Sequence, residues 1–186
     1  MTDVAVPHSS TAEGTVRRAA AGDEAAFARL IAEHNGVMAR VAYVILGDRE
    51  MTLDAVQSAW SIAWRRIGSV RQPAQIRSWL VAIAANEARQ QMRRKRRAVV
   101  VDISNAIDRH GNDDLGESAA VIDLGRALRR LAVEDRRLLS LRFVAGLDST
   151  EIAQHLGLSA SGVRSRLSRL IERLRSDLET EEGFRK

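Results

Sequence analysis

Short polar side chains bordered by arginines occupy one face of a predicted helix near the C-terminal end of the chain. Residues 150–175 fit two helices joined by the turn Gly157-Leu158-Ser159, in which glycine takes positive φ and serine caps the next helix. Short side chains allow close approach to a DNA major groove, and guanidinium groups reach phosphates or guanine edges. The pattern predicts a DNA-binding helix-turn-helix; the alternative is a helical hairpin with a solvated basic face. The residues expected at the DNA are Ser161, Arg164, Ser165, Arg166, Arg169 and Arg173.

A second cationic segment ends the helix that we expect after Pro73. Residues 93–97 are all cationic, and Arg89 lies one turn before them. Neighbouring cations repel one another and favour a counter-charge, so we expect phosphate contacts here; a solvated charge run is the simpler alternative. The net charge of +5 and the sequence pI of about 10.8 also favour a polyanionic partner. The cations concerned are Arg89, Arg93, Arg94, Arg96 and Arg97.

Several classes of protein are excluded by what the sequence lacks. It has no cysteine, which excludes disulfides and thiolate sites. Its four histidines are scattered, and no paired carboxylates or glycine-rich phosphate loop occur, so we expect no enzyme, no catalytic residue, no metal and no cofactor. No apolar run approaches the roughly 20 residues of a membrane span. The first residues do not form a secretory signal, and we expect a cytoplasmic protein without membrane insertion.

The elements that position these residues are predicted to be helices throughout. Abundant Ala, Leu and Arg, two prolines and the absence of alternating β-branched runs favour an all-α fold. Helical periodicity places one helix between Asp23 and Gly47, a second over residues 51–67 with Thr52 as its cap, and a third after Pro73. Trp60 and Trp64 share a face with Leu53 and are expected in the core rather than stacked on bases.

We expect two small helical domains joined by a flexible linker. Residues 98–120 are acidic and contain glycines, which is typical of a linker between domains. The expected division is a disordered tail over 1–14, a first domain over 15–97, the acidic linker over 98–120, a helix-turn-helix domain over 121–180 and a tail over 181–186.

Together, the two halves resemble bacterial RNA polymerase sigma factors of the extracytoplasmic-function (ECF) subfamily. The segment DAVQSAWSIAW resembles the family's helix that docks on the polymerase clamp, and RSWLVAIAANEARQQMRRKRR resembles the segment that melts and binds the minus-ten element. The segment from Ala127 to Arg175 resembles the region that reads the minus-thirty-five element. The resemblance covers residues 23–178 and implies a transcription initiation factor. Its partners would be core RNA polymerase, through the beta-prime clamp and beta flap, promoter DNA and an anti-sigma factor.

The resemblance also implies a role for individual residues. Asn86 has a donor and an acceptor on one amide and would read an unstacked base, while Arg89 and Arg93 hold the backbone. Trp79 would join the minus-ten site, although its place on the apolar stripe also fits core packing. The chain departs from the family pattern at Gln91 and Gly162, which bears on promoter preference. The polymerase-binding residues implied are Asp54, Gln57, Ser58 and Ser61, where Ser58 replaces a usual acidic residue.

One other class of function remains open from the residues alone. A stand-alone helix-turn-helix regulator, with an N-terminal half that senses a ligand or dimerises, would carry the same C-terminal pattern. Such a regulator would bind DNA specifically without polymerase and recognise paired half-sites.

Overall fold

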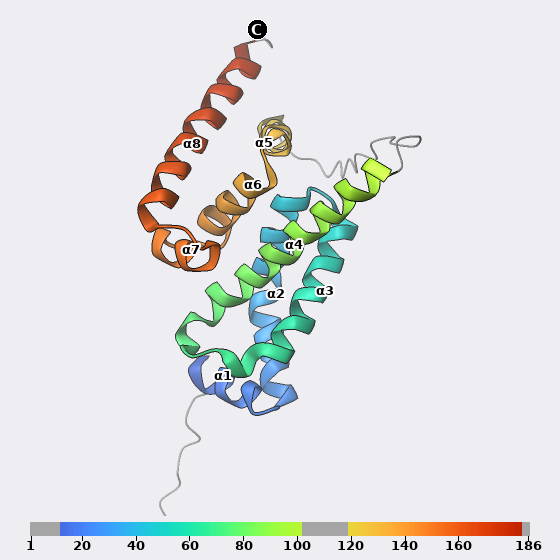
Figure 1. The fold of residues 1–186 in the computed structure, drawn as a ribbon, viewed down its shortest axis with the longest axis vertical. Helices are drawn as coiled ribbons and strands as arrows, with labels where there is room; N and C mark the ends of the chain where they lie inside the picture. The colour runs from blue at the N-terminus through green and yellow to red at the C-terminus, as the bar shows by residue number, and fades with distance from the viewer. Residues whose placement is uncertain (1–11, 102–118, 184–186) are drawn as a thin grey trace, which may run out of the picture.

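The first four helices form a bundle that buries most of the apolar residues of the N-terminal half. The computed structural model describes residues 12–101 and 119–183. It begins with α1 (Ala12–Ala20), α2 (Glu24–Leu46) and α3 (Arg49–Arg66), followed by the 3-10 turns Ile67–Ser69 and Pro73–Gln75 and by α4 (Ile76–Val101). The helices α2, α3 and α4 pack against one another, and α1 packs on α2 (Figure 1). The first domain is therefore held by side-chain packing between long helices rather than by any single element.

Aspartates begin the two helices α2 and α3. The Asp23 carboxylate accepts a hydrogen bond from the Ala26 N–H at 2.9 Å, as expected from the sequence. The N-cap of α3 is Asp48, whose side chain accepts from the Met51 N–H at 2.8 Å. The prediction that Thr52 is this cap is wrong, because Thr52 is buried one turn inside the helix and donates its hydroxyl to the Asp48 carbonyl. Asp48 is the N-cap because it directly precedes the first turn of α3, where its carboxylate can accept hydrogen bonds from N–H groups that have no partner within the helix.

The second half contains four more helices and one irregular turn. Helix α5 (Ala119–Arg130) leads into α6 (Val133–Leu139), which continues as a π-helical turn over Ser140–Val144. In this turn the Ala145 N–H donates to the carbonyl of Ser140, five residues earlier. Helices α7 (Ser149–Leu156) and α8 (Ala160–Gly183) complete the chain. All regular structure in the described ranges is helical, which confirms the all-α prediction.

The helix-turn-helix predicted from the sequence is formed by α7 and α8. Asp148 begins α7 with a capping box, in which its side chain accepts from the Glu151 N–H while the Glu151 carboxylate accepts from the Asp148 N–H. Gly157 ends α7 with φ of 67°, a conformation that glycine adopts without the penalty of a Cβ. The buried Val163 of α8 packs in the same core as Ile152 and Ala153 of α7.

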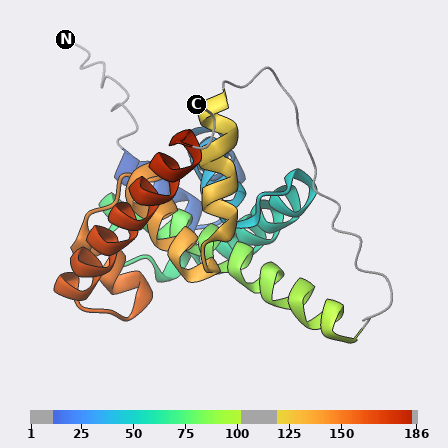
Figure 2. The same cartoon turned by 90° about the horizontal axis from the view of Figure 1, so that it is seen from above.

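The two halves of the chain pack against each other. Helix α6 contacts α2 and α4, and the π-helical turn contacts α2, so that the buried apolar residues of both halves belong to one continuous cluster. Away from this contact, the C-terminal part of α4 projects from the body of the molecule (Figure 2). Among the described residues, no helix is both long and apolar enough to cross a membrane.

The ends of the predicted segments differ from the helices observed. Helix α4 continues to Val101, past the expected start of the linker at residue 98, and residues 102–118 of that linker lie outside the described residues. Helix α1 begins at Ala12, inside the expected N-terminal tail, whose residues 1–11 are also outside the described part. Helix α8 extends to Gly183, into the expected C-terminal tail.

Two residues expected in the core lie at the surface. Leu53 is 64% exposed and Trp64 is 39% exposed, whereas Trp60 is buried and donates its indole N–H to Asn35 Oδ1 at 3.0 Å. Trp64 packs edge-on against Phe27, with ring centroids 4.8 Å apart. Helical spacing identified the correct side of α3 only approximately, because its apolar stripe is wider than the face that α2 and α4 cover.

The buried His34 of α2 makes the stability of the protein depend on pH. Burial lowers the pKa of this imidazole and the nearby Arg77 lowers it further, while Glu33, whose Oε1 lies 3.9 Å from Nε2, opposes the shift. A lowered folded-state pKa means that the unfolded chain binds more protons at mildly acidic pH. The contribution is therefore fully present above the unfolded pKa of about 6.5 and is lost as the pH falls through the folded value.

We predict that His34→Gln reduces the loss of stability on acidification, measured as the free energy of unfolding in urea at about pH 7.5 and about pH 5.5. Arg40→Gln, an exposed change on the same helix, serves as the control and should keep the wild-type pH dependence. An unchanged difference between the two pH values in His34→Gln would contradict the assignment of a neutral buried imidazole.

Candidate nucleic-acid interface

Trp79 and Asn86, both predicted to contact the minus-ten strand, line one cleft. This cleft has a volume of about 490 Å³ and lies between α3, α4, α6 and α7. Trp79 is half-buried and also packs against the hydrophobic core, so that one of its faces is structural and the other borders the cleft. Asn86 is half-buried and lines the cleft, so its side chain is held by the surrounding helices while part of it stays accessible to a ligand. His155 of α7 and Arg137 of α6 form the opposite wall.

The cationic end of α4 presents most of its charge to solvent. Arg93, Arg94, Arg96 and Arg97 are exposed on the part of α4 that projects from the molecule. Arg89, Arg93, Arg94 and Arg97 also line a recess of about 410 Å³. Several guanidinium groups on one recess can contact consecutive phosphates of a single strand, because each presents its donors in a fixed planar fork.

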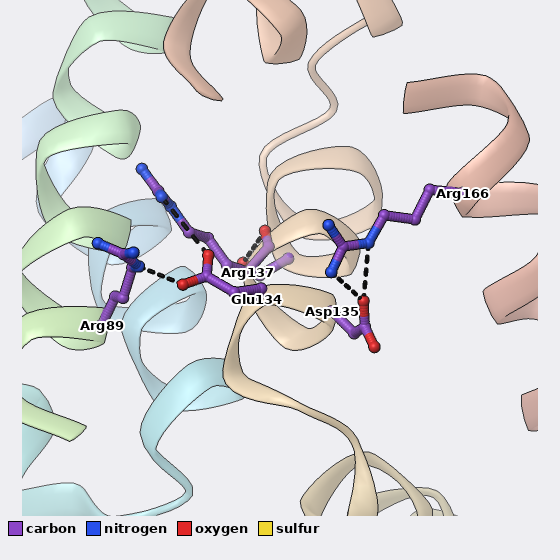
Figure 3. Close-up of polar contacts among 6 residues, drawn as sticks. Arg89, Glu134, Asp135, Arg137 and Arg166 are labelled. Atoms are coloured by element: carbon purple, nitrogen blue, oxygen red, sulfur yellow. Dashed lines mark hydrogen bonds and ion pairs between the residues drawn. The ribbon is translucent and has the colours of Figure 1, made fainter. Parts of the chain in front are cut away.

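Arg89 differs from the other cations of α4 because it is paired with a carboxylate from the second half of the chain. Its Nε donates to Oε1 of Glu134, which lies in the first turn of α6 (Figure 3). Glu134 also lies near Arg137, whose Nη1 is 3.8 Å from Oε2. The side chain of Arg89 is 28% exposed, compared with 44% for Glu134, so the pair is only partly shielded from water.

The neighbouring carboxylate, Asp135, holds an arginine of the helix-turn-helix. Nε and Nη2 of Arg166, on α8, both donate to Asp135 Oδ1, at 2.9 and 2.6 Å (Figure 3). Glu134 and Asp135, which we call the acidic turn, therefore pair with one predicted DNA-binding arginine from each half of the chain. The pairing of this turn could not be predicted from the sequence, because two acidic residues at the start of a helix are ordinary and nothing in their spacing indicates a distant partner.

Two arginines that follow the acidic turn are buried. Arg136 and Arg137 are 5% and 9% exposed, and the Nε atom of each is buried without a hydrogen-bond acceptor within the described ranges. Burial lowers the pKa of both guanidinium groups; Arg96 and Arg129 add to the effect at Arg136, and Arg89 adds to it at Arg137, where Glu134 opposes it. Both groups remain charged because arginine keeps its proton in proteins. Positive charge is therefore concentrated at the contact between α4 and α6.

Helix α8 exposes most of the residues predicted to contact DNA. Ser161, Arg164 and Ser165 lie exposed in its first turns, as do Arg169 and Arg173 further along. Arg166 is half-buried by its contact with Asp135, so the structure separates it from the other arginines of this face. Five of the six residues are thus exposed and Arg166 is not fully so, while their contact with DNA stays a prediction.

Gly162 has a local structural reason for its small size. Ser159 caps α8 by accepting the Gly162 N–H on Oγ at 3.0 Å. A Cβ added at Gly162 would lie 3.0 Å from the same oxygen, so a larger residue would require the capping hydroxyl to move by a few tenths of an ångström. The bearing of this glycine on promoter preference stays a prediction.

The residues predicted to bind polymerase gather on the outer face of α3. Asp54, Gln57 and Ser61 are exposed at helical spacing, and Ser58 is half-buried beside them. The Ser61 hydroxyl donates to the backbone carbonyl of Gln57 at 3.1 Å, and the Gln57 side chain is exposed. The exposed Leu53 adds apolar surface to this face, so its composition suits a protein contact rather than a nucleic acid.

Gln91 connects α4 to α3. With its amide oriented to satisfy both partners, Nε2 donates to the Met51 carbonyl at 2.9 Å and Oε1 accepts from the Ala55 N–H at 3.0 Å. The side chain is half-buried against α3. These contacts fix the position of α4 on α3. The bearing of this departure on promoter preference stays a prediction.

Comparison with known proteins places both halves in one family. Residues 30–98 match Sigma-70 region 2, and residues 122–174 match Sigma-70 region 4. The chain is 30% identical over 168 residues to the RNA polymerase sigma factor RfaY of Xanthomonas campestris pv. campestris, covering 86% of this chain and 42% of that protein. It is 30% identical over 170 residues to the ECF RNA polymerase sigma factor SigL of Mycobacterium tuberculosis, covering 88% of this chain and 95% of SigL.

The fold also has a solved counterpart. The sigma factor RpoE of Bartonella quintana, crystallised in complex with the anti-sigma factor NepR, superposes with a TM-score of 0.68 at 24% identity. The superposition covers 82% of this chain and 96% of RpoE. Because the matched regions contain the helices that carry the predicted sites, and SigL aligns over nearly its whole length, the chain belongs to the ECF subfamily of RNA polymerase sigma factors, which are transcription initiation factors and not enzymes.

Proposed function

We propose that this sigma factor docks on core RNA polymerase through the outer face of α3, captures the minus-ten strand on α4 and reads the minus-thirty-five element with α8. The observation that carries the proposal is the distribution of exposed side chains over the matched regions. Asp54, Gln57 and Ser61 line α3, and seven of the nine arginines expected at DNA are exposed on α4 and α8. The three surfaces lie on different helices, as is required for contacts with three different partners.

The division of labour follows from the chemistry of each surface. On α4, the Trp79–Asn86 cleft offers an aromatic face and an amide to a base that has left the stack, while cations beyond it bind phosphates. On α8, serines and arginines near the N-terminus match the geometry by which a recognition helix enters a major groove. Each domain then needs only modest affinity, because attachment to polymerase raises the effective concentration of the other contacts.

The proposal includes the partners and the location that this role implies. They are the beta-prime clamp and the beta flap of core polymerase, promoter DNA, and an anti-sigma factor such as the one with which RpoE was crystallised. The protein would act in the cytoplasm and join the nucleoid when bound to polymerase. The division into domains over 15–97 and 121–180 is part of this proposal.

We predict that core polymerase initiates at discrete sites only when this protein is added. A pool of genomic fragments is transcribed with core enzyme alone and with core enzyme plus the protein, and the 5′ ends of the transcripts are sequenced. Start sites that share two upstream elements are the expected result. A stand-alone regulator would instead bind duplex DNA specifically by itself and leave core polymerase unable to start at promoters.

Removing the polar side chains of α3 should weaken the complex with polymerase. We predict that Asp54→Ala combined with Gln57→Ala raises the Kd for core enzyme by about tenfold or more, equivalent to about 1.4 kcal/mol. Glu13→Ala, which removes an exposed carboxylate from α1, is the control and should bind as the wild type does. Equal affinity of the double variant and the control would show that α3 is not the docking helix.

Arg164 tests whether α8 reads bases. If its guanidinium contacts a base edge, Arg164→Ala should cost about 1–3 kcal/mol on the preferred minus-thirty-five sequence and relax selectivity at one position. A phosphate contact would instead weaken binding equally on every sequence and reduce the salt dependence. Binding of holoenzyme to promoter variants distinguishes the two results, and Gln154→Ala on α7 provides an exposed control in the same domain.

A further inference from the structure

The cleft that contains Trp79 and Asn86 is also lined by a buried arginine with an unused hydrogen-bond donor. Arg137 of α6 is 9% exposed, and its Nε has no hydrogen-bond partner within the described ranges. Its side chain extends from α6 toward α4 (Figure 3). The nearest carboxylate, Glu134, lies 3.8 Å from Nη1, which is too far for a hydrogen bond. Because buried donors are costly when they lack an acceptor, this guanidinium suits a ligand that supplies one.

A phosphate is the chemical group that fits the unused donor best. Arginine binds oxyanions side-on through Nε and Nη2, and Arg166 of this protein holds Asp135 Oδ1 through this edge at 2.9 and 2.6 Å. The same edge of Arg137 includes the Nε that has no acceptor. A phosphate would supply both acceptor oxygens and the negative charge that a buried guanidinium requires.

The remainder of the cleft suits a base and a sugar. Trp79 borders it with one face of its indole, and the half-buried Asn86 contributes an amide with a donor and an acceptor. A base that stacks on the indole can therefore also be recognised along its polar edge. The volume of about 490 Å³ lies within the range of about 300–1,000 Å³ that is usual for ligand pockets. The lining residues extend along α4 from Trp79 to Gln90, which is roughly 16 Å of helix.

The charge of the lining favours an anionic ligand over a cationic or apolar one. Arg65 and Arg66 of α3 line the cleft together with Arg137. Glu87 is the one carboxylate among the lining residues, and its Oε1 accepts a hydrogen bond from Gln90 Nε2 at 3.0 Å. Positive charge therefore exceeds negative charge around a cavity that also offers an aromatic face and an amide.

We propose that this cleft binds a free nucleoside polyphosphate, with its base on Trp79 and Asn86 and a phosphate on the Nε edge of Arg137. Binding of the nucleotide does not depend on the proposed function. Its consequence does rest on that function, because the nucleotide occupies the aromatic face and the amide that are assigned to a base of the minus-ten strand. The nucleotide and the strand then compete, and the nucleotide concentration regulates capture of the strand.

The direct test is calorimetric titration of the full-length protein, without polymerase or DNA, with each of the nucleoside triphosphates ATP, GTP, CTP and UTP. We expect at least one of them to bind at one site per chain with a Kd below about 1 mM. The nucleoside alone and inorganic tripolyphosphate are titrated separately. Each should bind about tenfold or more weakly than the complete nucleotide, because each makes only part of the contacts.

Two variants locate the nucleotide in the cleft. Arg137→Lys keeps the positive charge but removes the Nε edge, and it should weaken nucleotide binding by about tenfold. The same change at an exposed arginine of the same half of the chain, Arg164→Lys, is the matched control and should leave the Kd unchanged. Asn86→Ala should weaken binding of the nucleotide but not of tripolyphosphate. This second variant decides the matter if thermal unfolding shows that Arg137→Lys does not fold.

Three results would overturn the nucleotide site. These are the absence of saturable binding by all four triphosphates, equal affinity for the nucleotide and tripolyphosphate, and wild-type affinity in folded Arg137→Lys or in Asn86→Ala. Competition is tested by measuring the Kd of a mixed-sequence single-stranded DNA, which should rise as the nucleotide is added; a constant Kd would overturn the regulatory role. Failure of the proposed function would appear separately, as loss of promoter-dependent initiation, and would not alter the calorimetric result.

Discussion

Positive charge at the contact between the two domains is the constraint on which the rest of this structure depends. Arg136 and Arg137 are buried in α6, and Arg89 approaches them from α4. Guanidinium groups cannot lose their protons, so burying them is tolerated only when carboxylates and hydrogen-bond acceptors lie nearby. Glu134 supplies such a carboxylate at this contact. The contact therefore combines the cost of burying two guanidinium groups with the attraction of a nearby carboxylate.

Arg89 has two roles in this arrangement: it pairs with Glu134 of the acidic turn, and it is one of the cations of α4 on which the proposed function places a single strand. Arginines on a DNA-binding surface attract carboxylates as well as phosphates, because both are anions. The contact between the domains therefore needs no further type of residue. Apolar packing of α6 and the π-helical turn on α2 then sets the geometry in which the charges meet.

Most of the fold could be predicted from the sequence, because helical periodicity and capping act locally. The Asp23 cap, the glycine end of α7 and the helix-turn-helix follow directly from residue types at fixed spacing. The exposed residues of the candidate site on α3, α4 and α8 were predictable for the same reason. The face of a helix was predicted less well: Leu53 belongs to the apolar pattern of α3 but lies at the surface, since which part of a stripe is covered depends on the neighbouring helices.

The contact between the domains could not be predicted, because it joins residues far apart in the chain. Arg89 and Glu134 are separated by 45 positions, and each looks like an ordinary surface residue of its own helix. The role of Gln91 was missed for a similar reason, since its hydrogen bonds are to the backbone of α3, which carries no sequence signal. Pairings of this kind arise from tertiary structure and produce no periodic pattern in the sequence.

The π-helical turn at Ser140–Val144 has a consequence for how the family can vary. It accommodates one more residue than an α-helical turn would, and such insertions alter the direction of everything that follows them. The direction of α7 and α8 relative to α6 therefore depends on this turn. Gain or loss of a single residue here would change the direction of α7 and α8 relative to α6 while leaving every residue of α8 intact.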